Sequence, residues 1–164
     1  MAVHISLPSP RAIAAEKKYR ENLVRMGGSD MLQKRKDGAP CVRFSPWLAK
    51  ASPEVRLRVA DLILSSFRTG RPLKEVARDL KKILGTCESK SYRIIRREIR
   101  RLQHEREFFR FREMGIRQGT WKLDLEEGTH TRLKGKIFSL DDPIWNELNL
   151  DGCLCWCEPV VPDT

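Results

Sequence analysis

The sequence predicts an α+β fold in which a three-helix body is followed by a small C-terminal β-rich module and preceded by an extended N-terminal arm. Apolar residues recur at helical spacing between residues 52 and 114, whereas they alternate with polar residues after Gly115. The first fifty residues show neither pattern over most of their length. The expected boundaries are 1–50 for the arm, 51–115 for the helical body and 116–164 for the β-rich module.

Length and composition narrow the classes of protein. A chain of 164 residues fits one ordinary domain with a modest core. No uncharged stretch approaches the roughly 20 residues that a membrane-spanning helix needs, and the N-terminus lacks the pattern of a secretory signal. We therefore expect a protein of the cytoplasm that does not contact a membrane, and whose five cysteines are reduced thiols or metal ligands.

The predicted arm contains one short helical candidate, Ala12–Met26, which ends at two glycines. A polar run follows from Gln33 to Gly38. Such a run buries too little apolar surface to offset the entropy of ordering it, so we expect the arm to fold on a partner. A small apolar patch around Val42–Leu48 is expected to dock onto the body or onto another chain.

Three helices with clear start and stop signals make up the predicted body. They run from the N-cap Ser52 to Gly70, from Pro72 to Leu84, and from Ser89 or Ser91 to about Met114. A serine N-cap, a proline in the first turn and a glycine at the end are the residues that begin and end helices. The predicted strands are Trp121–Leu125, Lys136–Leu140 and Cys155–Val161.

The net charge of +10 is unevenly distributed. Residues 1–121 hold 28 Lys and Arg against 13 Asp and Glu, whereas residues 122–164 hold 4 against 9. A basic body favours a polyanion or an acidic protein surface as its partner, and a solubilising surface is the alternative. Phosphate contacts that do not read base sequence are expected from one face of the third helix. We assign these contacts to Arg93, Arg96, Arg97, Arg100 and Arg101.

A distant histidine and a run of cysteines form the second candidate site. His130, Cys153, Cys155 and Cys157 have the ligand chemistry of a zinc site. Residues two apart in a strand lie roughly 6.6 Å apart, however, so neighbouring cysteines would chelate one ion only on a bent backbone, which Gly152 could supply. The alternative is that these cysteines are small buried hydrophobic residues. We predict no resident cofactor, with zinc as the alternative.

Templates for enzymes are mostly missing. The chain has neither a glycine-rich phosphate loop nor a nucleophile elbow, and it contains three histidines in all. Asp124, His130 and a cysteine are the only set that resembles a catalytic group. We therefore predict that the protein is not an enzyme.

The order of these features resembles the phage Mu F-like minor head protein family, also called phage head morphogenesis proteins. The matching pieces are the Leu64–Leu80 hairpin, Ile94–Glu98, the Met114–Trp121 step, Asp124 with His130-x-x-Leu133-x-Gly135-x-x-Phe138, Gly152–Cys155, and Glu158–Val161. Arg97, Gly152 and Leu154 depart from the family pattern, which has Thr, Asn and Arg there. The motif residues are expected to be structural: Glu98, Trp121, Asp124, Gly135, Phe138 and Pro159.

This resemblance implies a minor component of the virion, bound to the portal or to the inner face of the capsid. Such a protein would act in head assembly, DNA retention or DNA ejection, with the portal or capsid protein as partner and packaged DNA as a further one. It would lie in the phage head, and in the host cytoplasm during assembly. Two alternatives stay open: a nucleic-acid-binding module that ignores base sequence, and a small metal-dependent hydrolase or toxin-like effector.

Overall fold

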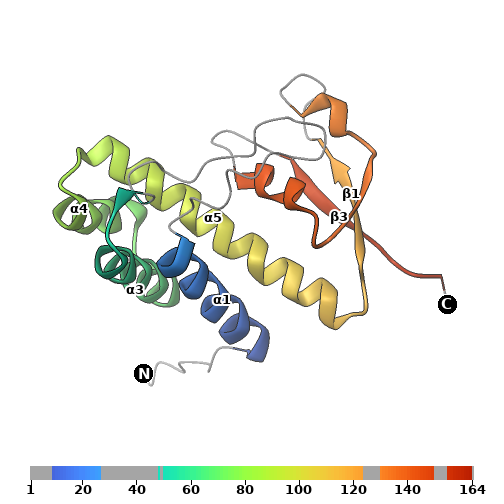
Figure 1. Ribbon diagram of the computed structural model, residues 1–164, viewed down its shortest axis with the longest axis horizontal. Coiled ribbons are helices and arrows are strands. Elements are labelled where there is room, and N and C mark those ends of the chain that lie inside the picture. Colours follow the sequence, from blue (N-terminus) through green and yellow to red (C-terminus); the bar gives the residue numbers. More distant parts are fainter. Residues whose placement is uncertain (1–8, 27–47, 49, 124–129, 150–154, 164) are drawn as a thin grey trace, which may run out of the picture.

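The computed structural model describes residues 9–26, 48, 50–123, 130–149 and 155–163. The four helices are α1 (Pro10–Met26), α3 (Pro53–Thr69), α4 (Leu73–Leu84) and α5 (Glu88–Glu113). The strands are β1 (Gln118–Lys122), β2 (Ile137–Ser139) and β3 (Trp156–Val160). Two short 3-10 helices, η2 (Thr131–Leu133) and η3 (Pro143–Asn149), lie between the strands. The predicted α+β class is confirmed, with a helical part followed by a C-terminal sheet (Figure 1).

The ends of α3 and α4 are formed by the capping residues that the sequence predicts. The Ser52 hydroxyl accepts a hydrogen bond from the backbone N–H of Val55, and Pro53 occupies the first helical position. Gly70 and Gly85 both adopt the left-handed conformation after the last helical residue, with φ of 64°. α5 differs slightly from the prediction, because it begins at Glu88 with Cys87 in the cap position.

Among the described residues, four helices of the body pack together instead of the predicted three. α1 lies within the predicted arm, but Tyr19 and Leu23 of this helix are fully buried against α3 and α5. Ser9 accepts a hydrogen bond from the backbone N–H of Ala12, and Pro10 follows it, as in the Ser52–Pro53 start of α3. The arm prediction is therefore wrong for residues 10–26, because this helix buries its apolar face on the body itself. The run Gln33–Gly38 lies outside the described residues.

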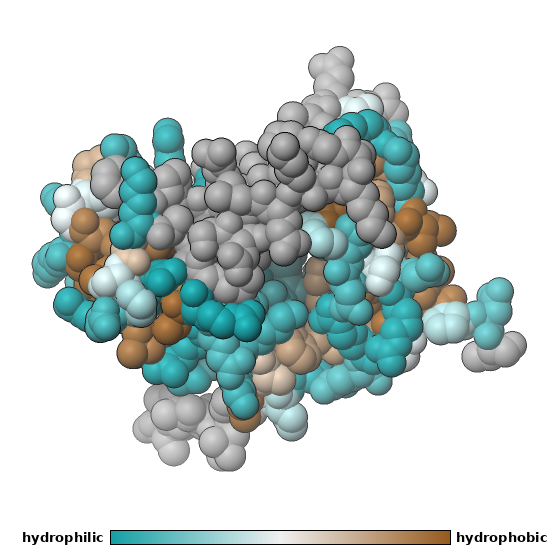
Figure 2. All heavy atoms as spheres, viewed as in Figure 1, coloured by the Kyte–Doolittle hydropathy of each residue, from teal (hydrophilic) through white to brown (hydrophobic). Residues whose placement is uncertain are grey.

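One apolar core joins the four helices, and its members come from all of them. It consists of Tyr19, Leu23, Leu48, Val59, Ala60, Ile63, Leu64, Val76, Leu80, Ile94, Ile95 and Leu102. Leu48 belongs to the apolar patch predicted at Val42–Leu48 and is fully buried here, whereas residues 42–47 lie outside the described part. Figure 2 shows polar residues over much of the described surface around this body.

The three strands form an antiparallel sheet in the order β2-β1-β3. Gly119 of β1 lies opposite Phe138 of β2 and Pro159 of β3. A glycine is needed at this position, because a Cβ atom there would lie 2.2 Å from Sγ of Cys157 and 3.2 Å from the Trp145 ring. The sheet therefore fits closely onto the residues beneath it.

A second apolar core lies between the sheet, η3 and the C-terminal end of α5. Trp121 is fully buried and stacks on Trp145 with ring centroids 5.2 Å apart. Trp145 donates a hydrogen bond from Nε1 to the carbonyl of Ser139, 2.8 Å away. Arg112 of α5 binds the Asp141 carboxylate, also at 2.8 Å. The long helix α5 thus belongs to both cores and connects the helical body to the sheet (Figure 1).

Candidate functional site

The five arginines predicted to contact a polyanion do not share one environment. Arg93 and Arg96 are exposed, and Arg97 and Arg100 are half-buried. Arg101 is buried, with a relative exposure of 2%. Arg101 is therefore placed where it cannot serve as a surface contact, whereas a contact through Arg93, Arg96, Arg97 and Arg100 stays a prediction.

Arg101 belongs to the inner face of α5, where it is part of a polar cluster. Its guanidinium lies 3.4 Å from the carboxylate of Glu98, which is fully buried, and 5.3 Å from the ring of Tyr19. The Tyr19 hydroxyl donates a 2.8 Å hydrogen bond to the same carboxylate. Burial raises the pKa of Glu98, although the charge of Arg101 opposes the shift. The prediction failed because α1, which supplies Tyr19, covers a face of α5 that was expected to meet solvent.

Three arginines form an outward stripe along α5, which we call the arginine stripe: Arg93, Arg96 and Arg100. Their spacing of three and four residues places them on one side of the helix, over about 10 Å. Within the part of the chain that the structure describes, none of them forms an ion pair, in contrast to Arg106 and Arg112 of the same helix. Phosphates repeat about every 3.4 Å along one strand of a duplex, so the stripe matches the length of about three phosphates.

The predicted histidine–cysteine site is partly assembled. Nδ1 of His130 lies 3.5 Å from Sγ of Cys155, and both residues are buried. Cys157 lies on the same inner face of β3, where burial, with a smaller contribution from the charge of Glu107, raises its pKa to about 12. Cys157 is therefore a neutral thiol in the second core. Cys153 and Gly152 lie outside the described residues.

Glu147, which the sequence analysis did not single out, is the third member of this cluster. Its Oε2 lies 3.0 Å from Nε2 of His130, on the side of the ring opposite to Cys155. The ring N–H is not aligned with this oxygen as in a full hydrogen bond, so the contact is mainly electrostatic. Glu147 follows Ile144 and Trp145 in a short 3-10 helix, and no local pattern marks it before the fold is known.

A single metal ion would need ligands that converge on one point. Cys155 and Glu147 meet His130 through different ring nitrogens, so these three side chains do not converge. Among the residues that the structure describes, no group of three or more His, Cys, Asp and Glu side chains is arranged to hold a metal ion. A zinc site that includes Cys153, which lies outside the described residues, stays a prediction.

The motif residues that the structure describes have structural positions. Glu98 and Trp121 are fully buried, and Phe138 packs edge-on against Trp145 at 5.9 Å. Gly135 has a positive φ of 73°, a conformation that other residues rarely adopt. Pro159 pairs with the close-packed position 119. The sixth motif residue, Asp124, lies outside the described residues, so its expected structural role stays a prediction.

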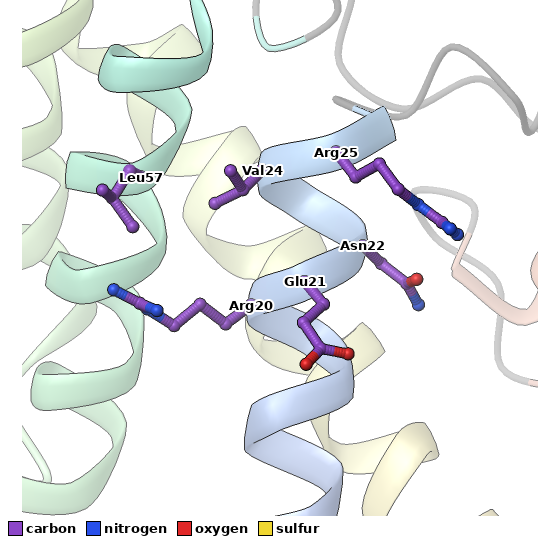
Figure 3. Close-up of a pocket in the computed structure, with 6 residues that line it drawn as sticks. All are labelled: Arg20, Glu21, Asn22, Val24, Arg25 and Leu57. Carbon is purple, nitrogen blue, oxygen red and sulfur yellow. The ribbon is translucent and has the colours of Figure 1, made fainter.

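A hollow of about 570 Å³ lies along α1 and α3 (Figure 3). Leu57 and Val24 face each other across it, whereas Arg25 and Asn22 point away from α3. Arg20 forms an ion pair with Asp61 at 3.0 Å. The lining residues contain neither a nucleophile nor a histidine, so the chemistry of a catalytic pocket is missing from the described lining.

Two further findings concern membrane-spanning helices and similarity to known proteins. Within the described ranges, no helix is both long and apolar enough to cross a bilayer. Comparison with models of protein families, with curated proteins and with solved structures yields no match. The case for a function therefore depends on the residues of this chain alone.

Proposed function

We propose that the protein is a structural minor head protein of a tailed bacteriophage, bound to the portal or to the inner face of the capsid. The observation that carries the proposal is the structural role of the motif residues. The described segments that resemble the family lie in one unit, in which α3 and α4 pack on α5 and α5 leads into the sheet.

The described motif residues are the ones that hold this unit together. Glu98 links α5 to α1 through Tyr19, and Trp121 is at the centre of the second core. Gly135 donates a 2.9 Å backbone hydrogen bond to the carbonyl of Trp121 and so closes the turn beside β1. Such residues specify a shape, which is the property that an assembly component needs, and they do not form a substrate site.

The arginine stripe supports a position close to packaged DNA or to an acidic protein surface. Arg93 and Arg96 are exposed, and guanidinium groups bind phosphates and carboxylates in two-pronged geometry. The N-terminal helix α1 is held to the body, so the basic surface is presented by a preformed scaffold.

The test is mass spectrometry of purified proheads and mature particles from the phage or prophage that encodes the chain. We expect peptides of the protein in the particle fraction at low copy number relative to the major capsid protein. Cells induced in parallel, with the gene deleted, serve as the control and should yield fewer infectious particles. Absence of the protein from both proheads and virions would refute the proposal.

The arginine stripe also favours a second candidate function, a nucleic-acid-binding module that ignores base sequence. A triple variant, Arg93→Gln/Arg96→Gln/Arg100→Gln, should weaken binding to duplex DNA. It should also lower the slope of log affinity against log salt by about 2.7, because each lost phosphate contact lowers it by about 0.9.

The matched control for this experiment changes the same charge elsewhere. Arg11, Arg20 and Arg78 are partly exposed, and each forms an ion pair with a described acid. Changing these three to Gln should leave the salt slope nearly unchanged. Equal losses in both triple variants would show that net charge, and not the stripe, controls binding. If the purified wild-type protein does not bind duplex DNA at low salt, this second function is refuted.

A further inference from the structure

The buried cluster beneath β3 has no role in the proposed function, although it has the arrangement of an activated nucleophile. Cys155, His130 and Glu147 come from three separate segments: the residue before β3, the residue before η2, and η3. Cys155 is the most exposed of the three, with a relative exposure of 8% against 5% and 4%.

The histidine ring is held in one orientation by its surroundings. The ring of Trp121 packs edge-on against it, with centroids 5.2 Å apart. Nδ1 faces the Cys155 sulfur at 3.5 Å while Nε2 faces the Glu147 carboxylate at 3.0 Å. A carboxylate beside Nε2 favours a proton on that nitrogen and leaves the lone pair of Nδ1 directed at the thiol. A thiol and a carboxylate thus both lie within contact distance of one histidine base.

We propose that Cys155 is a nucleophilic thiol that accepts an acyl group from an activated ester or thioester, with His130 as the base and Glu147 as a positioning residue. Sγ attacks the carbonyl carbon, and the thiol proton passes to Nδ1 of His130. The carbon–oxygen or carbon–sulfur bond of the donor then breaks, and its electron pair leaves with the alcohol or thiol, which takes the proton from Nδ1. The acyl group remains on Cys155 as a thioester.

Two other described cysteines, Cys157 and Cys87, provide internal references. Cys157 lies two residues along the same strand, but burial raises its pKa to about 12, so it should not react. Cys87 is exposed, and a hydrogen bond with the Ser89 hydroxyl lowers its pKa. Cys87 therefore reports the rate of an accessible thiol that has no histidine base.

The experiment uses the purified full chain and p-nitrophenyl acetate. Peptide mapping measures acetylation at each cysteine, and neutral hydroxylamine removes thioesters but not acetylated amines. We expect Cys155 to react at least as fast as Cys87 in spite of its burial, and Cys157 not to react. This arm needs no variant, so it tests the proposal whether or not substitutions disturb the fold.

The variants test the roles of the two partners. Glu147→Gln should lower the ratio of Cys155 to Cys87 acetylation about tenfold, and His130→Gln should lower it by about 100-fold or more. Glu158→Gln, which changes an exposed carboxylate on the outer face of the same sheet, is the control and should leave the ratio unchanged.

Three results would overturn the proposal. The first is slower acetylation of Cys155 than of Cys87 in the wild type, and the second is an unchanged ratio in Glu147→Gln at an unchanged melting temperature. The third is stoichiometric zinc in the purified protein that blocks acetylation until a chelator removes it, which would assign the cluster to a metal site. None of these results depends on whether the protein is found in phage particles.

Discussion

Glu16 of α1 binds arginines from two other helices, and this carboxylate provides the sharpest test of the four-helix body. Nε of Arg68 on α3 donates to Oε2 at 2.8 Å, and a second guanidinium nitrogen of Arg68 contacts the same oxygen. Arg106 on α5 donates to Oε1, also at 2.8 Å. The Glu16 side chain has an exposure of 3%, whereas Arg68 and Arg106 retain 57% and 32%.

This asymmetry determines which substitution is costly. Removing both arginines, as in Arg68→Met/Arg106→Met, leaves a buried carboxylate without its partners, and we expect a loss of about 3–5 kcal/mol. Glu16→Gln leaves two arginines that water still reaches, so we expect a smaller loss of about 1–3 kcal/mol. Changing Glu16, Arg68 and Arg106 together to Met should restore much of the stability, because no charge is then left buried alone.

Urea unfolding measures these differences. With a denaturant slope of about 2 kcal/mol/M, a loss of 4 kcal/mol lowers the midpoint by about 2 M. Arg11→Met, which breaks the more exposed ion pair between α1 and Glu113, is the control and should cost at most about 1 kcal/mol. A double arginine variant within 1 kcal/mol of the wild type would refute the reasoning. A denaturant slope lower in the double arginine variant than in the wild type would show that α1, without these ion pairs, unfolds separately from the rest of the body.

Three further predictions concern the two cores. Tyr19→Phe removes the hydroxyl that binds Glu98 and should lower the free energy of unfolding by about 1.5–3 kcal/mol in urea. Burial raises the pKa of Glu98 above its ordinary 4.5, so the folded state binds the carboxyl proton more tightly than the unfolded state does. The free energy of unfolding should therefore be higher below pH 4.5 and decline as the pH rises above 4.5, and Glu98→Gln should abolish this decline. The same pH dependence in Glu98→Gln as in the wild type would contradict this prediction. Gly119→Ala should lower the free energy of unfolding by about 1–3 kcal/mol, because the new methyl group meets the Cys157 sulfur. Adding Cys157→Ala to this variant should restore the lost stability. An unchanged free energy of unfolding in Gly119→Ala would show that the sheet can shift to make room.

Helix starts and stops could be predicted because their causes are local. The Ser52–Pro53 start, and the left-handed glycines that end α3 and α4, depend on neighbouring residues only. The predicted strands overlap the observed ones, but β1 begins three residues before the predicted Trp121–Leu125, and Leu123 lies beyond its end. Ser9–Pro10 carries the same start signal as Ser52–Pro53 and marks where α1 begins, but such a local signal does not show that α1 packs on the body.

Local signals in the sequence predict where the helices of this protein begin and end, since turn residues and apolar periodicity act over a few residues. Which face of α5 is buried depends instead on tertiary packing, because α1 brings Tyr19 to Glu98 and Arg101. Tertiary packing also decides that Glu147 and Cys155 meet His130 from opposite sides. Such contacts join residues far apart in the chain, and no local pattern encodes the distance between them.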